Sequence, residues 1–138
     1  MTASERTIFH ICRRAEWDAA VRSGFYDGSS QDESSGFIHF STAGQVVASA
    51  AKHRAGQSGL VLIEAAVAAL GAGLKWEPSR PDRGAVLNTA RGDSPARHGA
   101  LFPHLYGRMP ASAAVRVLDL PLGSDGRHVF PPELEARR

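Results

Sequence analysis

Cysteine is almost absent from this chain, whose 138 residues include only Cys12. A single thiol excludes an intramolecular disulfide framework and a zinc site of paired cysteines, and it fits a reducing compartment. We therefore expect a cytoplasmic protein. Cys12 itself is interpreted as a small buried apolar residue, because no second thiol accompanies it.

Long apolar runs are also missing. No stretch approaches the roughly 18 residues that span a bilayer. Residues 1–7 are polar, and no apolar segment of the signal-peptide type follows them. The sequence predicts a soluble chain that is neither secreted nor inserted in a membrane.

An excess of charge of one sign is lacking too. The 16 lysines and arginines nearly balance the 14 aspartates and glutamates, for a net charge of +2. This balance argues against the broad basic face of a nucleic-acid-binding protein. Several arginines still fall in one late stretch and favour a local anion contact: Arg80, Arg83, Arg91, Arg97 and Arg108. Four of them lie in 79–99, which is predicted to be a long loop from its Pro, Gly, Ser and Asn content.

The chain does have enough apolar material for one core. With 43% hydrophobic and 22% charged residues, it is predicted to form a single domain over 1–130, followed by a charged tail over 131–138. Compact apolar runs indicate strands, and these lie at 8–12, 37–41, 60–63, 74–77, 101–106 and 115–120. The unbroken aliphatic run at 60–63 predicts a strand covered on both faces. Pro103 lacks a backbone donor, so it favours a sheet edge for 101–106.

Two helices are predicted between the early strands. After the first strand, Trp17, Ala20 and Val21 share one face at helical spacing, and Gly24 supplies the stop. The second helix is predicted to start at Thr42, where the spacing to Gln45 forms a capping box. Too many strands follow one another for a regular βαβ alternation, so the order predicts an α+β fold with a split mixed sheet and two main helices.

Three of the six histidines lie inside apolar strand-like segments: His10, His39 and His104. Buried imidazole is costly without partners, so these rings call for a hydrogen-bonded network, a bound ligand or a metal. Taken alone, His10 and His104 are equally well interpreted as structural residues with satisfied hydrogen bonds, whereas this interpretation is less favoured for His39. Three together favour a pocket that they share.

Other polar residues accompany these strands. Ser41 and Thr42 stand where a strand gives way to a helix, a place where free N–H groups favour an anion. For Thr42 alone a simple helix cap is the preferred interpretation, and Ser41, which shares a face with His39, is the better ligand contact. The Glu77 carboxylate can polarise a hydroxyl or stabilise a developing cation, and the alternative is a solvated glutamate at a strand end. No glycine-rich phosphate loop is present, which argues against the nucleotide folds built on such loops.

The order of five motifs resembles the DUF952 family of small uncharacterised bacterial proteins. The motifs are I-F-H-I, E-W-D-A-A, G-F-I-H-F-S-T-A-G-Q-V, L-K-W-E-P-S-R and L-F-P-H-L-Y-G, and the resemblance spans residues 8 to 120. That family is similar in fold to the ADP-ribosyltransferases and the RNA 2'-phosphotransferases. The resemblance therefore implies an ADP-ribosylation-like split sheet with a cleft for NAD.

Roles for single residues follow from the resemblance. It puts His10 where the related enzymes touch a ribose, and it places a bracing Ser-Thr element at Ser41 and Thr42. The position of the usual transferase glutamate falls near His104 and Tyr106, and Glu77 is its candidate substitute. The implied catalytic residues are His104 and Glu77, and the implied substrate-binding residues are His10, His39, Ser41, Thr42 and Tyr106.

Three functions stay open at this point. The first is a transferase of the ADP-ribosyltransferase or 2'-phosphotransferase type, with NAD or a related nucleotide as the candidate substrate and no certain cofactor. The second is a non-catalytic module that binds a nucleotide or a small anion. The third, ranked last because the spacing matches no compact zinc motif, is a metal site of His10, His39 and His104. Nothing in the sequence specifies an oligomeric state.

Overall fold

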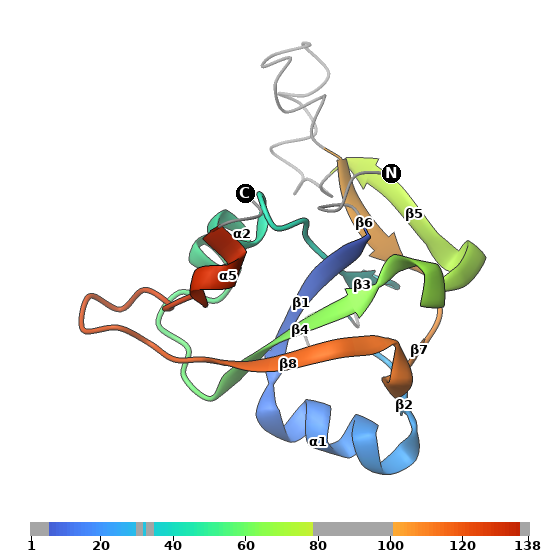
Figure 1. Ribbon diagram of the computed structural model, residues 1–138, viewed down its shortest axis with the longest axis horizontal. Helices are drawn as coiled ribbons and strands as arrows, with labels where there is room; N and C mark the ends of the chain where they lie inside the picture. Colours follow the sequence, from blue (N-terminus) through green and yellow to red (C-terminus); the bar gives the residue numbers. More distant parts are fainter. Residues whose placement is uncertain (1–5, 30–31, 33–34, 79–100, 136–138) are drawn as a thin grey trace.

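A fully buried central strand organises the structure. The computed structural model describes residues 6–29, 32, 35–78 and 101–135. Strand β4 (Leu60–Ala66) lies between β1 (Thr7–Arg13) and β8 (Ala114–Leu120), and Figure 1 shows the three strands crossing the middle of the molecule. Every residue of β4 from Leu60 to Ala65 is buried, so the prediction of a strand covered on both faces is confirmed.

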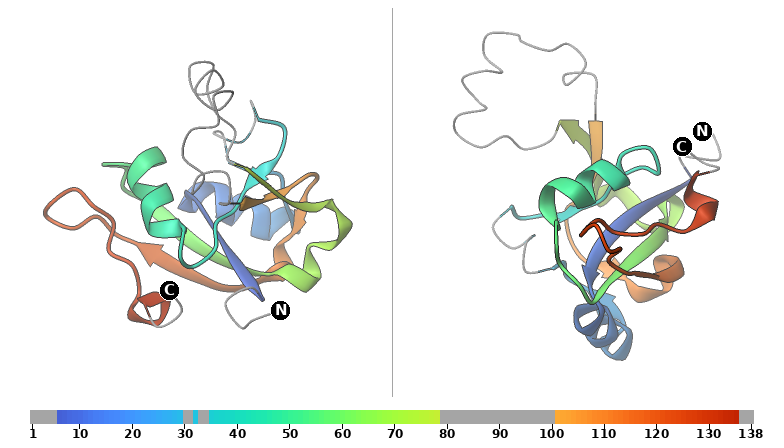
Figure 2. Two further views of the ribbon diagram at one scale, coloured as in Figure 1. Left: turned by 90° about the horizontal axis from the view of Figure 1, so that it is seen from above. Right: turned by 90° about the vertical axis from the view of Figure 1, so that its left-hand side faces the viewer.

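The two main helices cover opposite faces of this sheet (Figure 2). Helix α1 (Arg14–Ser23) follows β1 directly, and α2 (Val46–His53) precedes β4. Because side chains alternate along β1, Ile8 packs in the cluster that contains α1, whereas Phe9 packs in the cluster that contains α2. Strands β1 and β4 therefore lie between the two helices, and their apolar side chains point toward both.

The predicted end of the first helix is confirmed, whereas the predicted start of the second helix at Thr42 lies four residues before the observed start of α2 at Val46. Helix α1 ends at Gly24, whose φ of 93° lets its N–H bond Ala20, as predicted. The Gln45 side chain accepts the Thr42 N–H at 2.9 Å, which is one of the two hydrogen bonds of a capping box, but the N-cap of α2 is Gln45 and not Thr42. The prediction that Val21 faces the core is wrong, because its side chain is exposed.

A second sheet has the order β3-β6-β5, from β3 (Ile38–His39), β6 (Leu101–Leu105) and β5 (Leu74–Pro78). The predicted edge position of the 101–106 segment is wrong, since β6 lies in the middle. The Pro103 carbonyl accepts the Phe40 N–H at 2.9 Å. In an antiparallel strand the nitrogen and the carbonyl of one residue point to the same side, so the Pro103 nitrogen also faces Phe40. Phe40 lies just beyond the end of β3, and the missing N–H of Pro103 therefore breaks no hydrogen bond within the β3-β6 ladder.

The α+β class with two main helices is confirmed, but the expectation of a mixed sheet is wrong. Every strand pair among the described residues is antiparallel. The described part of the chain contains no helix that is both long and apolar enough to cross a bilayer.

Several short elements carried no clear signal in the sequence. They are β2 (Phe25–Tyr26) and its partner β7 (Met109–Pro110), the 3₁₀ turns η2 (Val67–Ala69), η3 (Gly71–Gly73) and η4 (Ala111–Ala113), and helix α5 (Pro132–Glu135). Within the segment predicted to be a charged tail, Leu134 is buried in the same cluster as Phe9. The predicted loop over 79–99, with four of the clustered arginines, lies outside the described residues.

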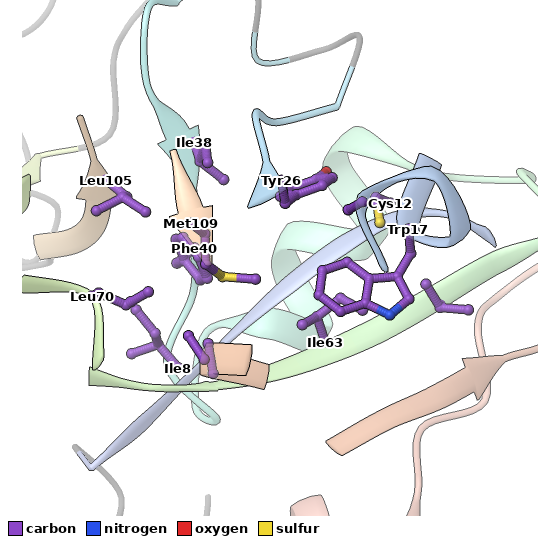
Figure 3. Packing of buried hydrophobic residues seen from close by; sticks show 14 residues of the cluster. Ile8, Cys12, Trp17, Tyr26, Ile38, Phe40, Ile63, Leu70, Leu105 and Met109 are labelled. Carbon is purple, nitrogen blue, oxygen red and sulfur yellow. The ribbon is translucent and has the colours of Figure 1, made fainter. Parts of the chain in front are cut away.

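The larger core cluster joins the two sheets (Figure 3). Ile8 and Ile63 reach it from the first sheet, while Ile38 and Leu105 reach it from the second. Cys12 is buried there, as predicted. Since one face of the β3-β6-β5 sheet is sealed by this core, its polar residues lie on the opposite face.

Gly73 fixes the entry of β5 against the end of β6. Its carbonyl accepts the Tyr106 N–H at 2.9 Å, and a Cβ built on Gly73 would lie within 2.4 Å of the Tyr106 carbonyl oxygen. We predict that Gly73→Ala lowers the free energy of unfolding by about 1–3 kcal/mol, because backbone must move to make room. Urea unfolding measures this difference. Gly44→Ala is the matched control, since the nearest atom to its Cβ is 3.9 Å away. Equal loss in both variants would contradict the close approach.

Candidate functional site

The face of the β3-β6-β5 sheet away from the core gathers four of the predicted residues: His39, His104, Glu77 and Tyr106. His39 and His104 are direct partners in the register of β3 and β6, and Lys75 of β5 lies opposite His104 on the other side. Direct partners and alternate residues share a face, which places Glu77 with both histidines. The two imidazole rings meet edge to face, with centroids 5.5 Å apart.

The carboxylate of Asp32 holds the His39 ring. Its Oδ1 accepts the His39 N–H at 3.1 Å and the Nδ1–H at 2.6 Å, while its Oδ2 accepts the Ser29 N–H at 2.6 Å and the Ser29 hydroxyl at 2.9 Å. Burial opposes ionisation of Asp32. The hydrogen bonds from His39 and Ser29 and the nearby His10 ring outweigh that effect and lower the Asp32 pKa to about 2.

This carboxylate determines which His39 nitrogen is available. Ionised Asp32 only accepts hydrogen bonds, so Nδ1 of His39 carries a proton. The other nitrogen, Nε2, has no hydrogen-bond partner among the described residues, and the His39 side chain is 43% exposed. A histidine oriented in this way can remove a proton from a bound molecule through Nε2.

A buried arginine supports Asp32 from behind. The Arg54 guanidinium, just after α2, donates to the Ser29 hydroxyl at 3.2 Å and to the Ile11 carbonyl at 3.0 Å. Ser29 in turn donates to Asp32. A buried carboxylate is costly unless it is hydrogen-bonded and balanced by positive charge, and Arg54 supplies this charge one hydrogen bond away.

His10 lies behind His39 in the core. Its Nδ1 is 2.5 Å from the His39 carbonyl oxygen and its Nε2 is 2.6 Å from the Tyr26 hydroxyl. Burial lowers the His10 pKa, although Asp32 at 3.8 Å acts in the opposite direction. In the neutral ring, Nδ1–H donates to the carbonyl and Nε2 accepts from Tyr26. Both nitrogens are therefore used inside the protein, and His10 holds the backbone of His39.

A second carboxylate holds His104. Glu77 Oε1 accepts from His104 Nδ1 at 2.9 Å and from the Tyr106 hydroxyl at 2.7 Å. These two hydrogen bonds lower the Glu77 pKa, so the carboxylate is ionised at neutral pH. His104 is only 3% exposed, whereas Glu77 is 35% exposed. Solvent and ligands can consequently reach Glu77 and Tyr106 in this group, but not His104.

Phe37 ties the two histidine groups together. Its ring stacks on His104 at a centroid distance of 4.1 Å and also approaches His39 at 4.6 Å and Tyr106 at 5.2 Å. Phe37 is itself buried. The result is an apolar floor beneath the half-exposed His39, Glu77 and Tyr106.

Ser41 and Thr42 are placed elsewhere. The Ser41 hydroxyl donates to Ser49 of α2 at 3.1 Å, and its backbone pairs with Phe9 of β1. The Thr42 N–H is used by Gln45. These contacts connect the end of β3 to α2 and β1, and they show no direct contact with the His39 or His104 rings.

The three predicted histidines do not converge as metal ligands in the part of the chain described. His39 and His104 touch, but His10 uses both ring nitrogens within the core. The described residues include no group of three His, Cys, Asp or Glu side chains that could hold a metal ion.

Asp32, Phe37 and Arg54 were missed by sequence reasoning. Asp32 falls in a segment rich in Gly, Ser and Asp that reads as a plain loop. The usable signal is weak: a single carboxylate seven residues before a strand histidine. Its position depends on a turn in which the Asp32 N–H bonds the Ser29 carbonyl at 2.9 Å.

The burial of neutral His10 predicts a loss of stability in mild acid. Because its folded pKa is depressed, its contribution is complete above the unfolded value of 6.5 and is lost as the pH falls below that value. We expect the free energy of unfolding to fall by about 1–2 kcal/mol between about pH 7 and pH 5. Urea unfolding across this range measures it. His10→Asn keeps a donor for the His39 carbonyl and should flatten the dependence. An unchanged slope would contradict the assignment.

The comparisons with known proteins agree on one family. The model described as "Protein of unknown function (DUF952)" matches residues 11–117. The crystal structure of CC0527 from Caulobacter crescentus is 39% identical, with a TM-score of 0.76, and the match covers 94% of this chain and 98% of that one. Its solution NMR structure is 40% identical, with a TM-score of 0.68 and coverage of 88% and 90%. No curated protein matches the sequence. The chain belongs to the DUF952 family.

Proposed function

We propose that this protein is a transferase that acts on NAD or a related nucleotide, in the manner of the ADP-ribosyltransferases or the 2'-phosphotransferases. One observation carries the proposal: ionised Glu77 and carboxylate-oriented His39 lie on the same sheet face. The two groups supply a fixed negative charge and a base within one site. The ADP-ribosylation-like fold implied by the motifs is part of this proposal.

Glu77 stabilises positive charge in the reaction. Release of nicotinamide from NAD passes through an oxocarbenium-like state, and a preorganised carboxylate lowers the energy of that state. The His104 ring and the Tyr106 hydroxyl both bind Oε1. Oε2 has no hydrogen-bond partner among the described residues and is the atom that faces the ribose or its hydroxyl. His104 acts through Glu77, which it positions.

His39 serves as the base. Nε2 accepts the proton of the incoming hydroxyl or phosphate while Asp32 keeps the ring in place through Nδ1. Tyr106 supplies an exposed ring for stacking. His10 supports the strand of His39 from the core, and Ser41 and Thr42 brace its far end against α2.

A non-catalytic nucleotide-binding module is the second candidate. The burial of His104 at 3% exposure favours it, because this ring cannot reach a bound molecule without movement of Phe37. In that case the same face binds the nucleotide through His39, Glu77 and Tyr106, and no bond is broken.

Turnover separates the two candidates. We predict that the purified full chain consumes NAD over time, and that His39→Ala and Glu77→Gln each reduce the rate by about a hundredfold or more. Liquid chromatography of NAD and nicotinamide measures the rate. His128→Ala is the matched histidine control, because His128 bonds the Gln57 carbonyl at 2.8 Å and is not part of the sheet face.

Calorimetry with NAD, ADP-ribose and a 2'-phosphorylated nucleotide completes the test. Binding without turnover supports the module instead of the enzyme. No heat with any of the three ligands at millimolar concentration contradicts both candidates.

A further inference from the structure

A surface hollow lies beside the candidate site, and neither His39 nor Glu77 is among the residues that line it. It has a volume of about 350 Å³ and is lined in part by Asp27, Asp32, Phe37 and Arg108. This volume lies at the lower end of the roughly 300–1,000 Å³ range of small-molecule pockets. Because Asp32 and Phe37 belong to both, a molecule in the hollow is next to the histidine groups.

The acidic groups of the hollow do not make it a cation site. Asp32 already accepts four hydrogen bonds, from Ser29 and His39. Asp27 is exposed and accepts from the Arg108 Nε at 3.0 Å and Nη2 at 3.4 Å. An exposed ion pair of this kind contributes little to stability and leaves Arg108 able to bind another anion. The remaining capacity of the hollow is therefore to donate hydrogen bonds.

Arg108 supplies these donors, and two contacts restrain its guanidinium group. Its guanidinium carbon lies 4.7 Å from the centroid of the Phe25 ring, and Asp27 holds one edge of the group. A guanidinium has five N–H donors in a rigid fork, and Asp27 engages only two of them. No other acceptor for Arg108 is found among the described residues, so the Nη1 donors are available to a ligand.

We propose that Arg108 binds a phosphate group of a nucleotide in this hollow, with Asp27 as the residue that orients it and limits its affinity. The identity of the ligand as a nucleotide rests on the proposed function, whereas the phosphate chemistry rests on Arg108. A planar guanidinium matches an oxyanion with parallel N–H donors, which favours a phosphate over a spherical anion. The negative charge of Asp27 repels the same anion and weakens its binding.

Isothermal calorimetry of the full chain with ADP, pyrophosphate and adenosine tests this site without requiring turnover. Arg108→Met should weaken ADP and pyrophosphate binding by about tenfold or more, since a charge-assisted hydrogen bond is lost. Asp27→Asn should tighten both severalfold. Adenosine lacks phosphate, so its weaker binding should be the same in all variants. Arg127→Met is the matched control, because Arg127 is also an exposed arginine but does not line the hollow. This variant should leave every affinity unchanged.

Four results would overturn the proposal. The first is that Arg108→Met and Arg127→Met bind ADP with the same affinity, and the second is that Asp27→Asn binds ADP more weakly than the wild type. The third is that Arg108→Met weakens adenosine binding as much as ADP binding. The fourth is that the wild type binds no ADP at millimolar concentration. Circular dichroism of each variant verifies that the fold is kept. If ADP binding depends on Arg108 but the protein does not consume NAD, the phosphate site is supported and the transferase activity is rejected. Failure of the phosphate site is therefore distinguishable from failure of the proposed function.

Discussion

Ionised Asp32, buried to 5% exposure, determines the geometry of the candidate site. It accepts four hydrogen bonds from Ser29 and His39, and through Ser29 it is linked to the buried Arg54 guanidinium. A carboxylate in such surroundings is stable only with this full set of donors. As a result Ser29, Asp32, the Arg54 side chain after α2 and the ring of His39 are held as one unit. The free Nε2 of His39 follows from that arrangement.

The packing of the two sheets determines which face of the second sheet carries the candidate site. The β3-β6-β5 sheet packs one face on the core through Ile38 and Leu105, so its other face is left for His39, His104 and Glu77. The histidines then differ in exposure: His10 is 4% exposed and His39 half-exposed, although they are joined through the His39 carbonyl. The buried His10 and His104 rings position His39 and Glu77 through hydrogen bonds, whereas His39 and Glu77 themselves face outward. The site is therefore built from buried imidazoles that position two accessible groups.

Local patterns in the sequence predicted much of the fold. The aliphatic run of β4, the helical spacing of Trp17 and Ala20, and the Gly24 stop each depend on neighbouring residues and were confirmed. Pairing depends on residues far apart, and there the predictions were weaker. The central place of β6 is compatible with Pro103, because its missing donor falls beyond the end of the short β3. Period-2 alternation places Glu77 with Lys75 along β5, but the common face of Glu77 and His104 depends on the β5-β6 register, in which Lys75 lies opposite His104. Asp32 reaches His39 through contacts that no periodicity encodes.

The proton position on His39 tests the central claim most directly. Two-bond ¹H–¹⁵N correlation spectra of the uniformly labelled protein at about pH 8 distinguish the two neutral tautomers of each histidine. The account predicts that His39 carries its proton on Nδ1, toward Asp32, and leaves Nε2 unprotonated. A spectrum in which neutral His39 is protonated on Nε2 would contradict it, because Asp32 would then not hold the ring and the base would be missing.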